Sequence, residues 1–137
     1  MNRSRQVTMS LALFVLICFF LPWVELSCGP VRDSVSGYAL ARSGHALLWL
    51  VPCFMAATVL LGLSRSIWER LPAAFVLPGI VGGGISAFLM LRERWAANGS
   101  PRLIDAAWSP IFWLGVAAAI GVAVAALAFY ARRVRAP

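Results

Sequence analysis

The chain has 137 residues, of which 61% are hydrophobic and only 12% are charged, and its formal net charge is +7. No polar stretch is long enough to bury a core of its own, so the composition excludes a separate water-soluble domain. The arginines lie between or beyond four apolar stretches, which indicates anionic lipid headgroups rather than nucleic acid as their counter-charge.

Four segments predict membrane-spanning helices, at residues 7–26, 45–64, 71–91 and 108–131. Each has 20 residues or more, and a helix needs about 20 residues to cross a hydrocarbon core of about 30 Å. None has the polar stripe of a soluble amphipathic helix. The sequence therefore predicts an all-α integral membrane protein. Residues 1–137 form one domain, an antiparallel, up-down bundle of four transmembrane helices.

The arginines also predict an orientation. Seven lie at the termini and in the loop 65–70, and five lie in the longer loops 28–44 and 92–105. By the positive-inside rule, both termini face the cytoplasm and the two longer loops face outward. Every basic residue is arginine, which we interpret as the mark of a GC-rich bacterial genome. The predicted location is the bacterial inner membrane, crossed in several passes.

Aromatic residues gather toward the predicted outer side. Five of the six tryptophans map there, and only Trp68 maps to the cytoplasmic side. Trp23, Tyr38 and Trp95 each lie where a helix meets an outer loop, so we expect them to contact a partner protein. The alternative is an aromatic belt at the lipid headgroups. Cys28, on the same side, is left open between a free thiol, a lipidated one and a disulfide.

Small residues predict where the helices touch one another. Gly79 and Gly83 form a GxxxG spacing, and Ala117, Gly121 and Ala125 recur at four-residue intervals. Helices in lipid associate where small side chains allow their backbones to approach closely. These residues are predicted to pack helices together, either within the bundle or against a partner subunit, including a second copy of the chain.

His45 is the only histidine and begins the second apolar segment, with Ala41 four residues before it and Trp49 four after. This spacing resembles the pigment-ligating helices of bacterial antenna polypeptides, and the resemblance implies that His45 coordinates a bacteriochlorophyll magnesium. Arg42 and Ser43 place His45 at the membrane edge, however, so a solvated interfacial histidine is the alternative.

The sequence predicts no catalytic or metal site. No two acids, and no histidine and acid, converge on one predicted site. Glu25, Asp33, His45 and Asp105, all on the predicted outer side, could cluster, but nothing in the sequence requires it. The predicted helix interiors hold no carboxylate, which disfavours an ion-coupled carrier. We therefore expect a non-catalytic accessory or assembly subunit of a larger membrane complex, whose partners are other membrane proteins and lipids. No cofactor is predicted. The alternatives are a protein that binds a pigment, quinone or lipid in the outer leaflet, and a small channel or carrier.

Overall fold

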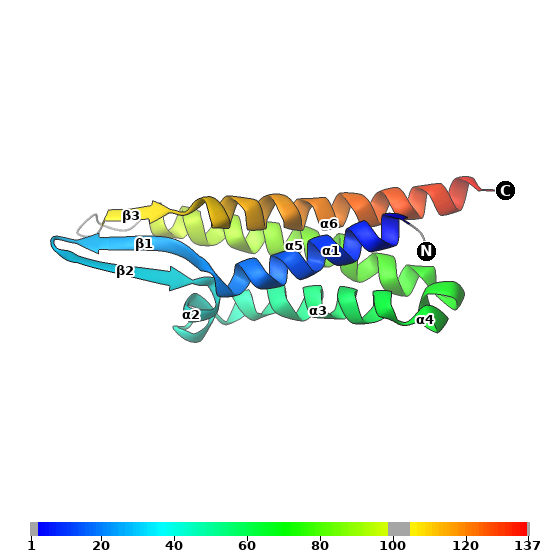
Figure 1. Ribbon diagram of the computed structural model, residues 1–137, viewed down its shortest axis with the longest axis horizontal. Coiled ribbons are helices and arrows are strands. Elements are labelled where there is room, and N and C mark those ends of the chain that lie inside the picture. The colour runs from blue at the N-terminus through cyan, green and yellow to red at the C-terminus, as the bar shows by residue number, and fades with distance from the viewer. Residues whose placement is uncertain (1–2, 99–104, 137) are drawn as a thin grey trace.

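The computed structural model describes residues 3–98 and 105–136. Four long helices lie side by side: α1 (Arg3–Phe20), α3 (Leu50–Leu63), α5 (Pro72–Asn98) and α6 (Pro110–Arg135) (Figure 1). A short 3-10 helix, η1 (Ala46–Trp49), leads directly into α3. All four helical segments, with η1 joined to α3, are long and apolar enough to cross a membrane. The prediction of four membrane-spanning helices is confirmed to that extent.

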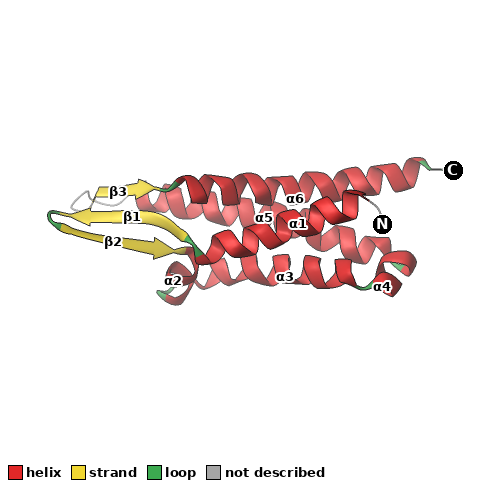
Figure 2. Cartoon of the chain, viewed as in Figure 1, coloured by secondary structure: helices red, strands yellow, loops and turns green. Residues whose placement is uncertain are grey.

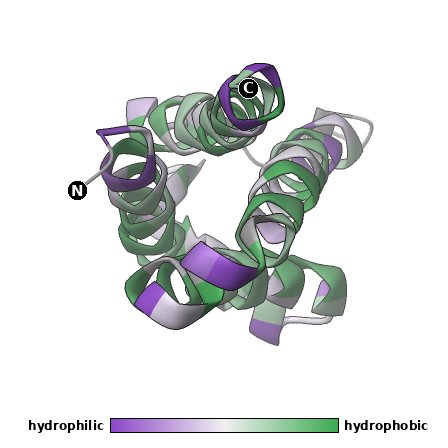
Figure 3. Ribbon diagram, turned by 90° about the vertical axis from the view of Figure 1, so that its right-hand side faces the viewer, coloured by the Kyte–Doolittle hydropathy of each residue, from purple (hydrophilic) through white to green (hydrophobic). Residues whose placement is uncertain are grey.

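The two ends of the bundle differ. One end holds both chain termini and the short helix α4 (Arg65–Arg70), and the other holds the strands and the short helix α2 (Gly37–Arg42) (Figure 1). We call them the terminal end and the sheet end. The helices are mostly apolar along their length, whereas hydrophilic residues gather at the terminal end, which faces the viewer in Figure 3.

Glycines bring α5 close to α6. A Cβ atom on Gly83 would lie 2.6 Å from the Ala119 carbonyl oxygen, and one on Gly79 would lie 2.8 Å from the Ala126 Cβ. Both glycines therefore lie at a helix contact inside the chain. Gly121 faces α1, where a Cβ would lie 3.1 Å from a methyl group of Leu11.

The predicted small-residue face of α6 is not the face that meets α5. Ala117 is exposed and Ala125 is only partly buried, while Ala119 and Ala126 are buried and lie against the α5 glycines. The four-residue spacing was present in the sequence, but α6 carries alanines on several sides, so spacing alone did not fix its rotation.

The prediction of an all-α protein is confirmed only in part: the chain is mostly helical, but the sheet end carries a three-stranded antiparallel sheet. Its strands are β1 (Pro22–Cys28), β2 (Val31–Ser36) and β3 (Asp105–Trp108), in the order β2-β1-β3. Leu26 of β1 lies opposite Asp33 on one side and Ala106 on the other. The residues predicted as the end of helix one and the approach to helix four are thus extended strands.

Helix α1 ends at Phe20 for a local reason. Pro22 has no N–H to donate to the Cys18 carbonyl four residues back, so the helical ladder cannot continue. Leu21 donates its N–H to that carbonyl at 3.2 Å instead, and the Trp23 indole donates Nε1–H to the same oxygen at 2.7 Å. The last carbonyls of a helix need such partners when they are buried.

The hairpin between β1 and β2 is closed by two residues, Gly29 and Pro30. Gly29 adopts φ +61, a left-handed conformation that glycine takes without steric cost, at the first central position of the turn. Proline in the second position fixes its own φ near −65°. After β2, the Ser36 hydroxyl accepts the Ala39 N–H at 3.2 Å and caps the start of α2.

Candidate functional site

The sheet end contains the histidine and the three aromatic side chains that the sequence singled out as candidates for binding. Trp23 lies at its centre and is 0% exposed. Its ring packs edge-on against Phe19 at 5.8 Å and against Phe112 at 5.6 Å between ring centroids. Gly37 at the start of α2 lies directly on the indole, since a Cβ there would come within 2.5 Å of it. Trp23 therefore joins α1, α2 and α6.

The backbone around Trp23 ties β1 to the start of α6. The Ser109 N–H donates to the Trp23 carbonyl at 2.8 Å, and the Ser109 hydroxyl donates to the Pro22 carbonyl at 3.0 Å. The same hydroxyl accepts the Ile111 N–H at 3.1 Å, which caps α6. One serine thus begins the last helix and fixes the first strand beside it.

The three predicted partner-contact residues have different surroundings. Trp23 is inside the chain, whereas Trp95 near the end of α5 is 65% exposed. Tyr38 in α2 is partly buried. Its ring lies 5.7 Å from the ring centroids of both Phe20 and Trp49, and the Arg42 guanidinium lies 5.8 Å from the Tyr38 ring. We name the group of Phe20, Tyr38 and Trp49 the aromatic cluster. A partner contact at any of the three predicted residues stays a prediction.

His45 lies against an acid, Glu93, that the sequence did not place near it. Its Nδ1 lies 2.8 Å from Glu93 Oε2, and the Glu93 side chain is only 11% exposed, against 46% for His45. Glu93 was not expected beside His45 because the predicted third helix ended at residue 91. Helix α5 continues to Asn98, which keeps Glu93 on the helix, facing the start of η1. Pigment ligation by His45 stays a prediction.

A cavity of about 280 Å³ lies beside this pair. It is bounded by the apolar face of the sheet, by α2 and by the end of α5, with His45 and Glu93 as its charged or titratable side chains. A volume of this size is near the lower limit of small-molecule pockets, which are mostly apolar with a few placed polar groups. The lining residues are Val24, Val35, Leu40, His45, Glu93, Ala96 and Trp108.

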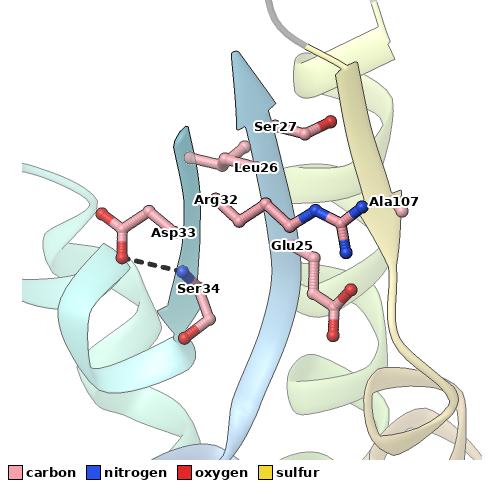
Figure 4. Close-up of a pocket in the computed structure, with 7 residues that line it drawn as sticks. All are labelled: Glu25, Leu26, Ser27, Arg32, Asp33, Ser34 and Ala107. Atoms are coloured by element: carbon pink, nitrogen blue, oxygen red, sulfur yellow. Dashed lines mark hydrogen bonds between the residues drawn. The ribbon is translucent and has the colours of Figure 1, made fainter. Parts of the chain in front are cut away.

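The opposite face of the sheet is polar and forms a wider hollow of about 550 Å³ (Figure 4). The Arg32 side chain reaches across β1 toward Ala107 of β3, on the side where Glu25 also lies. The Asp33 carboxylate accepts the Ser34 N–H at 2.8 Å. The lining residues are Glu25, Leu26, Ser27, Arg32, Asp33, Ser34 and Ala107.

The possible metal ligands and the thiols of the described residues are scattered. Among residues 3–98 and 105–136, no group of three histidine, cysteine or acidic side chains is placed to hold a metal ion. Cys18 is buried and Cys53 is exposed, and both are free thiols. The side chain of Cys28, whose state the sequence left open, lies outside what the structure describes, as does that of Trp68.

The buried polar side chains of the described bundle are hydroxyls. Thr8 and Thr58 each donate to the carbonyl four residues earlier in their own helix, at 2.9 Å. Ser86 of α5 is 0% exposed, and its hydroxyl has no hydrogen-bond partner. A hydroxyl is not titratable at ordinary pH, so these groups do not supply the embedded charge that coupled transport uses.

Comparison of the chain with protein-family models, with curated proteins and with solved structures finds no match. The functional argument therefore rests on the geometry of the sheet end and of the bundle.

Proposed function

We propose that this chain is a small, non-catalytic accessory or assembly subunit of a larger complex in the bacterial inner membrane. The observation that supports the proposal is the sheet, whose hairpin projects beyond the ends of the helices (Figure 2). Four of the six residues of β2 are exposed. A small sheet without a core of its own has little independent stability. Contact with a partner protein would explain why such a sheet extends beyond the bundle.

The partner contact that we propose uses side chains rather than strand addition. In the edge strand β2, the Ser34 N–H already donates to the Asp33 carboxylate. Charged side chains on an edge strand oppose its pairing with a strand of another chain. Exposed aromatic side chains offer more contact energy, because interface hot spots are enriched in Trp and Tyr. The proposed contacts are Trp95, which is exposed, and Tyr38, which is partly buried. Trp23 supports the start of the helix that carries Tyr38.

The test is co-purification of the complex from native membranes after Tyr38→Ala or Trp95→Ala. A hot-spot truncation costs about 2 kcal/mol, roughly thirtyfold in affinity, so each change should release much of the partner. Trp68→Ala, in α4 at the terminal end, is the control and should leave the complex intact. Loss of the partner from the Trp68 variant alone would place the contact at the other end.

We also propose that the helices alternate in direction, with both termini in the cytoplasm. Both termini and α4 lie at one end (Figure 1), and this end has seven of the twelve arginines. The test uses single cysteines at Val31 and Arg135, in a background without the native cysteines. A membrane-impermeant reagent should label Val31→Cys in intact cells and leave Arg135→Cys unlabelled. The reverse pattern would invert the orientation.

The second candidate function is binding of a hydrophobic small molecule at the sheet end. The observation that favours it is the cavity of about 280 Å³ beside the His45–Glu93 pair. Ala96→Phe would narrow this cavity without removing either member of the pair. If a co-purified organic molecule is lost from that variant while partner proteins are retained, the second candidate is the better one.

A further inference from the structure

We propose that the terminal end carries a binding site for the phosphate headgroup of an anionic phospholipid. The site is a hollow of about 230 Å³ between the start of α1 and the end of α6, lined by Ser4, Phe129, Arg132, Arg133 and Ala136. It lies at the opposite end of the bundle from the proposed partner contact, and so is independent of it.

The hollow has an aromatic floor. Phe129 is 2% exposed, and its ring packs edge-on against Phe75 of α5, with 6.0 Å between ring centroids. The Arg133 guanidinium lies 5.6 Å from the centre of the Phe129 ring, an attractive cation–π distance. Phe129 thus places one charged group beside the hollow, and Arg132 adds a second, exposed one.

The net charge at this end favours an anionic ligand. The terminal-end segments contain seven arginines and one acid, Glu69, for a net charge of +6, whereas the sheet-end segments contain five arginines and four acids, for a net charge of +1. Together these make the net charge of +7 of the whole chain. Glu69 accepts a hydrogen bond from Arg65 at 2.9 Å. Nearly all of the net positive charge is therefore concentrated at the end that holds the hollow.

The surroundings favour a lipid over a free anion. Arginine binds phosphate oxygens through paired N–H donors, and basic pockets between membrane helices bind anionic lipid headgroups. Phe129 belongs to the apolar helix Pro110–Arg135. The exposed side chains of Val7 on α1 and Val134 on α6 continue the apolar surface near the hollow, at 51% and 66% exposure. A lipid gains contact with this surface through its acyl chains, and a free phosphate ion does not.

The test measures lipid binding to the full-length protein in detergent, by native mass spectrometry and titration. The probes are a short-chain phosphatidylglycerol and the phosphatidylcholine with the same chains. We expect phosphatidylglycerol to bind more tightly. Each basic side chain near a headgroup contributes about fivefold in affinity, so Arg132→Gln and Arg133→Gln should each weaken phosphatidylglycerol binding by about that factor. Circular dichroism checks that the variants keep their helices.

The matched control is Arg135→Gln, which removes the same charge from the same end but does not line the hollow. It should change the affinity by less than about twofold, because salt screens exposed charges that lie farther away. An equal loss in all three variants would show diffuse attraction rather than a site. Equal binding of the two lipids, or displacement of phosphatidylglycerol by inorganic phosphate at equal concentration, would also contradict the proposal.

Discussion

The helical bundle and the sheet end are held together by different kinds of contact. In the bundle, α5 and α6 approach through glycine and alanine, with Gly83 directly against the Ala119 backbone. At the sheet end, Trp23 is surrounded by ring contacts and hydrogen bonds, and Ser109 links β1 to α6. Lipid offers helices no hydrophobic driving force for association, so close packing is used there. Where the chain leaves the helices, its backbone groups need new partners.

The two regions are suited to different roles: the bundle to contact with lipid, and the sheet end to recognition of a partner or ligand. The bundle presents large apolar side chains outward, as contact with lipid requires. The sheet end combines a buried aromatic centre, a contact between a histidine and a carboxylate, and exposed aromatic side chains. Specific recognition of a partner or ligand needs such mixed chemistry, which is why the proposed functions are placed there.

The largest expected effect comes from removing the centre of the sheet end. Trp23→Ala would leave a cavity between α1, α2 and α6 and remove the donor to the Cys18 carbonyl. Truncating a buried Trp typically costs about 3–5 kcal/mol. We expect the free energy of unfolding in detergent to fall by about that amount, and the sheet to become accessible to protease before the bundle does.

Trp95→Ala is the matched control for this prediction, because Trp95 is the same residue type but is 65% exposed. Its free energy of unfolding should stay within about 0.5 kcal/mol of the parent, as for most surface changes. If both variants are equally stable, Trp23 does not join the sheet to the bundle and the contrast between the two regions is lost.

The second effect concerns the bundle. Gly83→Ala would bring a methyl group within 2.6 Å of the Ala119 carbonyl oxygen, whereas the same change at Gly84 meets nothing within 4 Å. Overpacking typically costs about 1–3 kcal/mol, and alanine at an open helical position gains up to about 1 kcal/mol over glycine. We expect Gly83→Ala to lower the melting temperature and Gly84→Ala to leave it unchanged or raise it. A stable Gly83→Ala variant would show that α5 and α6 separate at little cost.

The four long helices were predictable from the sequence because their length and apolarity are local properties. Their contacts were predictable only in part. Gly79 and Gly83 lie at a helix contact, but the opposite residues are Ala126 and Ala119 rather than Ala117. The rotation of α6 about its own axis depends on all the helices that pack against it. The spacing of small residues along α6 alone does not determine that rotation.

The sheet was missed although part of its pattern was present. Val24 and Leu26 alternate with Glu25 and Ser27, and a Gly-Pro pair follows, which is typical of a strand and a tight turn. The apolar run before Pro22 dominated the prediction. The strand β3 has only four residues, too few for a periodic pattern. The His45–Glu93 pair joins residues far apart in the sequence, and finding it required the true end of α5.

The smallest expected effect is that of the His45–Glu93 pair, which tests whether the sheet end is also stabilised by charge. The measurement is a double-mutant cycle with His45→Gln and Glu93→Gln, followed by unfolding in detergent. Because the His45 side chain is 46% exposed, solvent screens the pair, and we expect a coupling energy of roughly 0.2–1 kcal/mol. The Arg65–Glu69 pair, whose side chains are 86% and 52% exposed, is the reference, because solvent screens an exposed pair on a helix surface strongly. Glu93 is more buried than Glu69, so its pair should have the larger coupling energy of the two. A smaller value would mean that the His45–Glu93 contact contributes little to joining η1 and α5, and that Trp23 and Ser109 hold the sheet end without its help.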